Sequence, residues 1–121
     1  MKKILLLVTF ILTTCLSYSQ EISDVSISGT VLTVRDENNN VISNYILSYG
    51  DELCGFSSTI IVIKNQTVVR VYDQKFNSIS NHILSYGDKV KNVSGNNIIV
   101  KNGNVITTYD KKFNVVSTRI E

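Results

Sequence analysis

The sequence predicts an all-β protein made of three tandem antiparallel β-meander repeats of 37 residues. The stretch Val68 to Asp88 recurs upstream as Val31 to Asp51 and downstream as Val105 to Ile120, each time at this offset. Over a core of sixteen residues, the middle copy is identical to each of the others at eight positions. Apolar residues in each copy alternate with period two and are mostly β-branched or aromatic, which is typical of strands. A fixed period of this size indicates a repeat architecture.

The first two strands of each copy are predicted to form a hairpin. In the third copy, Asn97 to Lys101 and Asn104 to Tyr109 flank the dipeptide Asn102-Gly103. Asn-Gly between two such runs predicts a type I′ turn, in which both central residues have positive φ. The repeat places the same turn at Ser28-Gly29 and at Asn65-Gln66, where Gln66 suits it least.

A second turn is predicted after an aspartate that all three copies share. Asp and Asn side chains bind nearby backbone N–H groups and so close turns. Each aspartate is followed four residues later by an asparagine; the pairs are Asp36 and Asn40, Asp73 and Asn77, and Asp110 and Asn114. The structural role of these carboxylates is therefore preferred over a catalytic or calcium-binding one.

The remaining strands of a copy follow this turn. A third strand is predicted through Ile79 to Tyr86, ending at a Tyr-Gly-Asp bend. Short segments around Leu53 to Phe56 and Lys89 to Val93 add a fourth strand. The chain starts just before the first strand of copy one and stops after the third strand of copy three, and so holds about 2.7 units.

Many of the predicted strands are apolar on both faces. Val69 and Val71 occupy one side of a strand whose other side carries Val68 and Tyr72. In antiparallel sheets this pattern implies packing on both faces, as when sheets stack against neighbouring sheets. An open stack would leave two apolar end faces, so we expect a homo-oligomer that covers them.

The run Gly103 to Val116 resembles the G-N-x-I-x-V-[FY]-D-x-x-G-x-[FL] pattern in blades of NHL-type and six-bladed β-propellers, and the middle copy from Thr67 to Ile79 is similar. Phe76 and Phe113 stand where that pattern has a turn glycine. The resemblance implies propeller-like blades. Propellers have four to eight blades, so three would close a ring only by association of subunits. The alternative is a β-trefoil or β-prism, in which three units close within one chain.

The first twenty residues form a separate segment. Lys2 and Lys3 precede the apolar run Ile4 to Leu12, and Ser17 and Ser19 fit a cleavage site before Gln20. This predicts a signal peptide over residues 1–19 and a single all-β repeat domain over residues 20–121, secreted or periplasmic. The alternative is a lipoprotein anchored through Cys15, and no later segment is apolar enough to span a membrane.

Charge argues against nucleic acid as a partner. The chain has twelve Lys and Arg against ten Asp and Glu, and two of the lysines belong to the predicted signal peptide. The remaining cations are scattered between acidic residues, so no basic stripe or membrane-binding patch forms.

A Ser-His-Asp or Cys-His catalytic site needs a histidine as its base. Beyond residue 20 the only histidine is His82, which we interpret as a strand residue on a polar face, and the only cysteine is Cys54, which we expect to be partly exposed. One His and one Cys do not make a usual zinc site, so we expect no enzyme activity, no metal and no cofactor.

The sequence therefore predicts an exported, non-catalytic binding or adhesion module for a glycan or protein ligand. Tyrosine offers aromatic surface with a polar tip, which suits both ligand classes. The candidate ligand-contacting residues are Tyr49, Tyr72, Tyr86 and Tyr109. The alternative is a structural or regulatory subunit of a larger exported assembly.

Overall fold

The computed structural model describes residues 21–121. The predicted signal peptide and Cys15 lie outside the described residues. The described part has antiparallel strands only, in three sheets of three, four and four strands, and this confirms the all-β prediction. The strands are β1 (Asp24–Ser28), β2 (Val31–Arg35) and β3 (Val41–Ile46) in sheet 1, β4 (Asp51–Phe56), β5 (Ile61–Asn65), β6 (Val68–Tyr72) and β7 (Ser78–Ile83) in sheet 2, and β8 (Lys89–Ser94), β9 (Asn97–Asn102), β10 (Val105–Asp110) and β11 (Val115–Ile120) in sheet 3.

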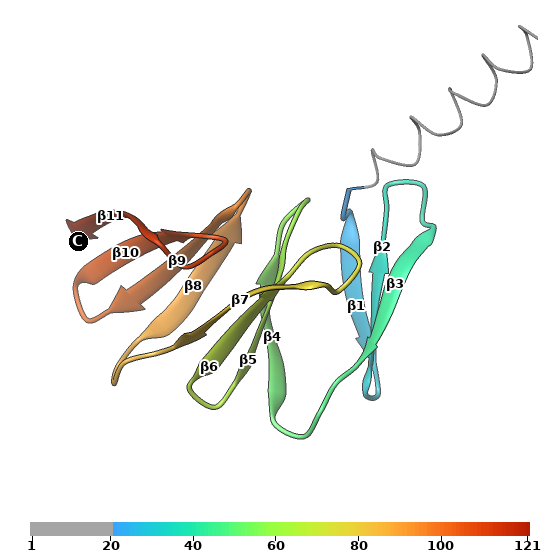
Figure 1. Cartoon of the computed structure of the whole chain (residues 1–121), viewed down its shortest axis with the longest axis horizontal. Coiled ribbons are helices and arrows are strands. Elements are labelled where there is room, and N and C mark those ends of the chain that lie inside the picture. The colour runs from blue at the N-terminus through green and yellow to red at the C-terminus, as the bar shows by residue number, and fades with distance from the viewer. Residues whose placement is uncertain (1–20) are drawn as a thin grey trace, which may run out of the picture.

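The three sheets stand side by side in chain order, as Figure 1 shows. Sheet 1 and sheet 2 enclose one apolar core around Leu32, Val34 and Ile61, and sheet 2 and sheet 3 enclose a second core around Val69 and Ile98. Neither core of the described residues joins sheet 1 to sheet 3, so the threefold closure of a trefoil or prism is not found. Both faces of the middle sheet are covered, as its two-sided apolar pattern predicts.

The hairpin turns lie one residue later than predicted. Gly103 and Asn104, rather than Asn102-Gly103, form the two-residue loop, because Asn102 pairs with Val105. Gly103 has φ 59°, while Asn104 is not among the residues with positive φ. A positive φ at the first central residue alone is the type II′ pattern, so the predicted type I′ turn is wrong. The equivalent loops begin at Gly29 and at Gln66, whose φ is 55°.

The second turns are built as predicted. The Oδ1 atom of Asp73 accepts hydrogen bonds from the backbone N–H groups of Lys75 and Asn77, both at 2.9 Å. The same pair of bonds recurs at Asp36 and at Asp110, which confirms that these carboxylates close turns.

The third strand is shorter than predicted, because β7 ends at Ile83 and residues 84–88 connect it to β8. The side chain of Asp88 accepts a hydrogen bond from the N–H of Ser85 and folds this segment into a turn. The predicted fourth strand exists: β4 and β8 are the first strands of sheets 2 and 3. Each lies at the sheet edge opposite β7 or β11, and β4 and β8 contact each other.

The outermost face of sheet 1 is mixed, because it carries the exposed Val31 and Ile46 beside polar side chains. On this face Asp24 lies opposite Arg35 and Ser26 lies opposite Thr33, and all four side chains are exposed or half-buried. At the equivalent positions, sheet 2 has the apolar residues that pack against sheet 1. Asp24, Ser26, Arg35 and Asn39 stand where sheet 2 has Ile61, Ile63, Tyr72 and Phe76.

The outermost face of sheet 3 is mixed. Ile106 is buried and Ile99 is half-buried there. Around them, Lys91, Thr108 and Glu121 stand where sheet 2 has Cys54, Val71 and Leu84. Both ends of the stack therefore carry polar side chains at positions that are apolar between the sheets, as terminal units of repeat proteins do.

Candidate functional site

Two of the four candidate tyrosines are fully exposed at the tips of tight turns. Tyr49 lies between β3 and β4, and the N–H of Asp51 donates to the carbonyl of Ser48 at 3.0 Å to close the turn. Gly50 follows with φ 89°, the conformation that the third residue of a type II turn requires. A side chain on Gly50 would also approach the amide oxygen of Asn65 to 3.3 Å. The turn therefore requires glycine for two reasons.

This turn is held from the neighbouring hairpin. The side-chain amide of Asn65 donates to the carbonyl of Tyr49 at 3.0 Å and to the carboxylate of Asp51 at 2.8 Å. The other oxygen of Asp51 accepts from the N–H of Ser48 at 2.8 Å. The backbone of the exposed tyrosine is thus fixed on both sides.

The same construction recurs at Tyr86, between β7 and β8. The amide of Asn102 donates to the carbonyl of Tyr86 at 2.9 Å and to Asp88 at 2.8 Å, and Gly87 has φ 87°. Tyr86 is as exposed as Tyr49. The two turns therefore present the same side chain on the same rigid support.

Exposed aliphatic residues border these turns. Each third strand ends in an isoleucine that is 72–79% exposed and pairs across the sheet with a valine beside the hairpin turn. We call the edge of the stack that carries these residues the turn rim; it lies along the lower edge of sheets 1 and 2 in Figure 1. The turn rim comprises Tyr49 and Tyr86 with the pairs Val31 and Ile46, Val68 and Ile83, and Val105 and Ile120.

The other two candidate tyrosines lie between sheets. Tyr72 is 8% exposed and packs against Tyr45 and Phe76. Tyr109 is half-buried and packs in the same way against His82 and Phe113. The structure therefore does not bring Tyr72 and Tyr109 together with the two exposed tyrosines.

His82 is not on a polar face, which corrects the prediction. Its ring stacks on Phe113 with centroids 4.4 Å apart, as Tyr45 stacks on Phe76 at 4.5 Å. A hydrogen bond with Tyr72 raises the pKa of Tyr45 above its ordinary value. Phe76 and Phe113 have φ 63°, so each ring is held in a backbone conformation that usually favours glycine. Stacking between the sheets explains why phenylalanine occupies this turn.

Cys54 is half-buried, in agreement with the predicted partial exposure. It packs at the margin of the core between sheets 2 and 3. Burial raises the pKa of its thiol, which disfavours the nucleophilic thiolate. Within residues 21–121, no group of three His, Cys, Asp or Glu side chains is placed to hold a metal ion.

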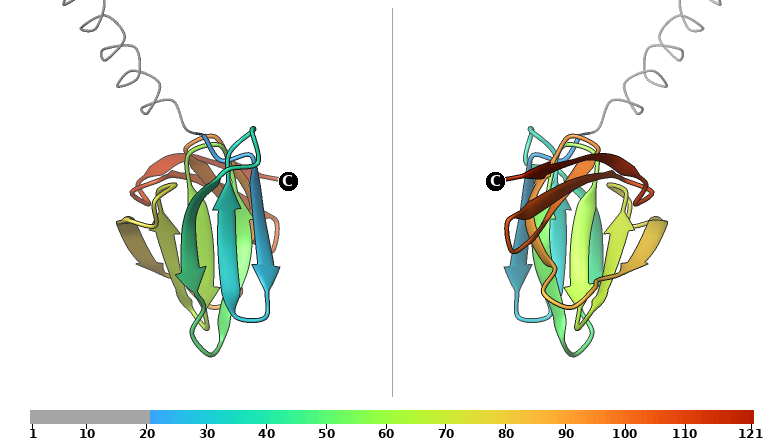
Figure 2. Two further views of the ribbon diagram at one scale, coloured as in Figure 1. Left: turned by 90° about the vertical axis from the view of Figure 1, so that its right-hand side faces the viewer. Right: turned by 90° about the vertical axis from the view of Figure 1, so that its left-hand side faces the viewer.

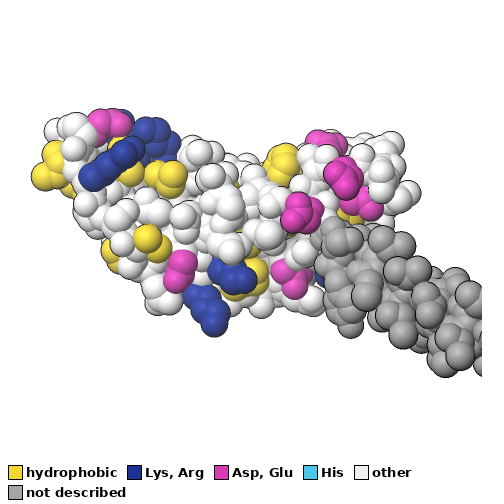
Figure 3. Space-filling model, turned by 90° about the horizontal axis from the view of Figure 1, so that it is seen from above, with side chains coloured by type: hydrophobic (Ala, Val, Ile, Leu, Met, Phe, Trp, Pro, Cys, Tyr) yellow, Lys and Arg dark blue, Asp and Glu magenta, His cyan; other side chains and the backbone are white. Residues whose placement is uncertain are grey.

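Charge is distributed unevenly along the stack. Residues 21–46 contain one basic and four acidic residues, whereas residues 89–121 contain six basic and two acidic residues. Figure 3 shows most of the acidic side chains toward the end with sheet 1 and a basic cluster at the end with sheet 3. The two ends of the molecule therefore differ in sign.

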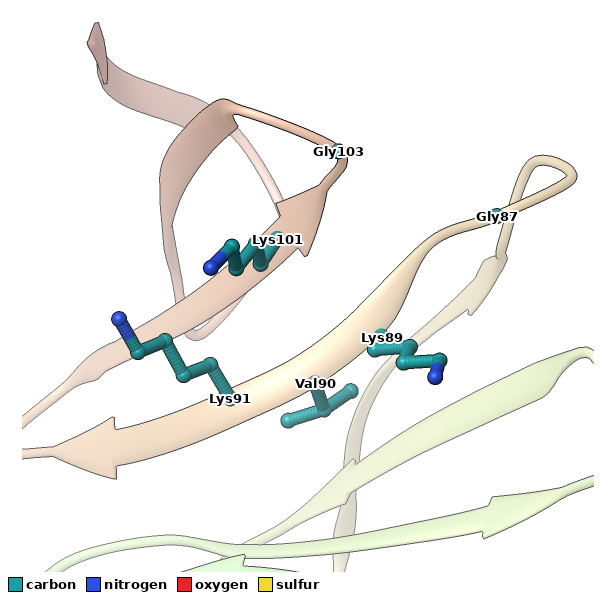
Figure 4. A pocket seen from close by; sticks show the side chains of 6 residues that line it. All are labelled: Gly87, Lys89, Val90, Lys91, Lys101 and Gly103. Carbon is teal, nitrogen blue, oxygen red and sulfur yellow. The ribbon is translucent and has the colours of Figure 1, made fainter. Parts of the chain in front are cut away.

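A hollow of about 580 Å³ lies beside β8 and is lined by Gly87, Lys89, Val90, Lys91, Lys101 and Gly103. Figure 4 shows Lys91 and Lys101 on one side of the β8–β9 ribbon and Val90 on the other. Glu121 pairs with Lys91 at 3.5 Å and with Lys101 at 2.9 Å. The Glu121 carboxylate offsets one of the three lysine charges around the hollow, so net positive charge remains there.

Sequence reasoning missed the isoleucines of the turn rim. Ile46, Ile83 and Ile120 fit the alternation of a strand that packs on both faces, and their sequence does not distinguish them from core residues. Their recurrence at the end of each third strand, next to a turn, was the available signal. No helix among the described residues is long and apolar enough to span a membrane.

No protein-family model matches this sequence, and no curated protein matches it. Solved structures are similar in fold. A protein of unknown function from Bacteroides caccae matches with a TM-score of 0.56 and 16% identity, over 83% of this chain and 40% of that one. BamB from Moraxella catarrhalis matches with a TM-score of 0.52 and 14% identity, over 80% of this chain and 32% of that one. Hsv2 from Kluyvelomyces marxianus matches with a TM-score of 0.54 and 14% identity, over 84% of this chain and 40% of that one.

BamB and Hsv2 are β-propellers, so the comparison confirms the propeller-like resemblance of the sheets. The identities are low, and the likeness therefore concerns the fold alone. This chain spans 32–40% of the length of these three proteins.

Proposed function

We propose that this protein is an exported, non-catalytic binding module that takes a protein ligand on the turn rim. The observation that carries the proposal is the pair of fully exposed tyrosines, Tyr49 and Tyr86, each on a turn that four hydrogen bonds hold in place. Tyrosine supplies large contact area at little cost in conformational entropy and is enriched among residues that dominate binding energy.

The surroundings of the tyrosines favour a protein over a glycan. Sugar recognition needs free polar groups beside the aromatic ring, but the nearest amides and carboxylates hold the turns. Asn65 and Asp51 are engaged with each other and with the turn backbone, and Asn102 and Asp88 are engaged in the same way. The exposed isoleucines, together with Val31 and Val105, supply apolar contact area instead, which suits protein partners.

A non-catalytic role agrees with the packing of the two reactive side chains. His82 is stacked on Phe113, and the thiol pKa of Cys54 is raised by burial. Each side chain has a structural use, and within residues 21–121 neither one belongs to a group of three His, Cys, Asp or Glu side chains that could hold a metal ion.

The predicted homo-oligomer stays part of the proposal, with the turn rim as the surface that would form it. Repeating the sheet-to-sheet packing between copies is unfavourable. Tyr45 meets Tyr72 at 5.6 Å and His82 meets Tyr109 at 5.4 Å, and the equivalent pair between copies would be Arg119 and Arg35. Two guanidinium groups at that distance repel each other. Light scattering at micromolar concentration measures the oligomeric state.

The binding proposal is tested with a library of displayed peptides and a glycan array, both probed with the protein. Peptides selected on the protein should bind about 30-fold more weakly to a Tyr49→Ser, Tyr86→Ser double variant, as expected when binding residues worth about 2 kcal/mol are lost. A matched control, Val41→Ser with Val115→Ser, changes exposed valines at the far ends of β3 and β11 and should leave binding unchanged.

Glycan binding that depends on both tyrosines, with no peptide selected, would overturn the choice of a protein ligand. Equal losses in the double variant and in the valine control would overturn the choice of the turn rim. Export is tested separately: mass spectrometry of the mature protein should find Gln20 at its N-terminus, whereas a lipid on Cys15 would support the anchored alternative.

A further inference from the structure

Among residues 21–121, the first sheet has one strand fewer than its neighbours. In sheet 2, β4 pairs with β5, and in sheet 3, β8 pairs with β9. The counterpart of β5 and β9 in sheet 1 is β1, and within the described part of the chain β1 pairs with β2 alone. Figure 2 shows β1 at the margin of sheet 1, with no described strand of the same sheet beyond it.

The hydrogen-bonding groups on this edge follow from the turn that leads to β2. Gly29 and Thr30 form a two-residue loop, so Ser28 and Val31 exchange both of their backbone hydrogen bonds. Bonded residues alternate along an antiparallel strand. The N–H and C=O groups of Val25 and Ile27 therefore point away from β2. In β5 the equivalent residues lie on the edge that β4 occupies.

The side chains around the edge define what an added strand would need. On the side toward sheet 2 lie Val25 and the 45% exposed Ile27, with the half-buried Leu53 and Phe56 of β4 in the same apolar core. On the other side lies the polar end face that begins at Asp24. An extended segment with alternating apolar and polar residues satisfies both sides at once.

We propose that the free edge of β1 takes an extended segment of a partner polypeptide as a fourth, antiparallel strand. The added strand gives sheet 1 the same number of strands as sheets 2 and 3. Main-chain hydrogen bonds to Val25 and Ile27 hold the segment, and its alternate apolar side chains cover Leu53 and Phe56. This site is separate from the turn rim and does not depend on the function proposed for that surface.

The test uses a synthetic peptide with the sequence of residues 50–57 carrying the substitution C54V. It contains β4, the strand that pairs with the counterpart of β1. Amide hydrogen exchange of the full chain is followed residue by residue with and without peptide. When about nine-tenths of the sites are filled, exchange of the Val25 and Ile27 amides should slow about tenfold, since only the unfilled tenth exchanges. Slowing confined to the β3, β7 or β11 edges, or no slowing at all, overturns the proposal.

A pair of variants isolates the main-chain contact. Ile27→Pro removes an N–H that makes no bond to β2, and proline is tolerated on sheet edges. Ile27→Ala shortens the same side chain and keeps the N–H. Binding of the peptide should weaken about tenfold in Ile27→Pro relative to Ile27→Ala. Equal binding by the two variants, with melting temperatures that show both folded, contradicts strand pairing at β1.

Two further measurements separate this site from the others. The Tyr49→Ser, Tyr86→Ser variant should bind the peptide as the unchanged protein does, so failure at the turn rim and failure at β1 are distinguishable. Protection of the Val25 and Ile27 amides that rises with protein concentration, without peptide, would mean that a second copy occupies the edge. That result would overturn the assignment to a partner polypeptide.

Discussion

Replacing Gln66 by glycine should stabilise the protein. Gln66 is the first central residue of the β5–β6 turn and has φ 55°, in the left-handed region. The equivalent residues of the other two sheets are glycines, Gly29 with φ 61° and Gly103 with φ 59°. The Gln66 side chain is exposed, so the substitution leaves the core unchanged.

The expected gain is the difference between two backbone effects. A residue with a Cβ atom in the left-handed region costs roughly 1–2 kcal/mol. Glycine costs about 0.5–1 kcal/mol through the greater freedom of the unfolded chain. The Gln66→Gly substitution should therefore raise the free energy of unfolding by about 0.5–1 kcal/mol.

Urea unfolding of the full chain measures this gain. For a domain of this size the midpoint should rise by about 0.5 M. Gln66→Ala keeps the Cβ atom and should give no gain, and the reciprocal change Gly103→Ala should lower the midpoint by a similar amount. The explanation by backbone strain fails if Gln66→Gly leaves the midpoint unchanged or lowers it, or if Gly103→Ala has no effect.

Replacing Asn65 or Asn102 by alanine should lower the free energy of unfolding by about 0.5–1.5 kcal/mol in each case, because each amide donates hydrogen bonds to a tyrosine turn and to the aspartate that begins the following strand. Urea midpoints of the two variants check this. A lower midpoint in only one of them contradicts the equivalence of the two turns. The N–H of Asn114 holds the pKa of Asp110 below its ordinary 3.8, so this contribution to stability is complete above pH 3.8 and is lost as pH falls through the depressed pKa. The fall of the urea midpoint with acid should therefore be smaller in Asp110→Asn, and an unchanged acid profile would refute the linkage. Because burial raises the pKa of Cys54 above 9.0, iodoacetamide should alkylate this thiol more slowly than free cysteine at neutral pH, and a rate equal to that of free cysteine would show that the thiol is open to solvent.

Local features of the sequence determined the strands and most of the turns. Alternation of apolar residues fixed where strands form, because a strand must place successive side chains on opposite faces. The shared aspartates identified the second turns, since a carboxylate that bonds backbone N–H groups two and four residues later acts over a short range. The propeller-like resemblance rested on the same short motifs and did not require knowledge of the sheets.

Tertiary structure alone decided which apolar residues remain exposed. Ile83 and Val69 both fit the strand pattern, but Ile83 lies at the turn rim and is 72% exposed, whereas Val69 is fully buried between sheets. Tyr72 and Tyr86 differ in the same way, because one lies opposite a neighbouring sheet and the other at the tip of a turn. Burial depends on the sheet that packs against a residue, and the residue's own neighbours in sequence do not encode that sheet. The polar residues at the two ends of the stack could be recognised only from the order of the sheets, because that order decides which faces lack a neighbouring sheet.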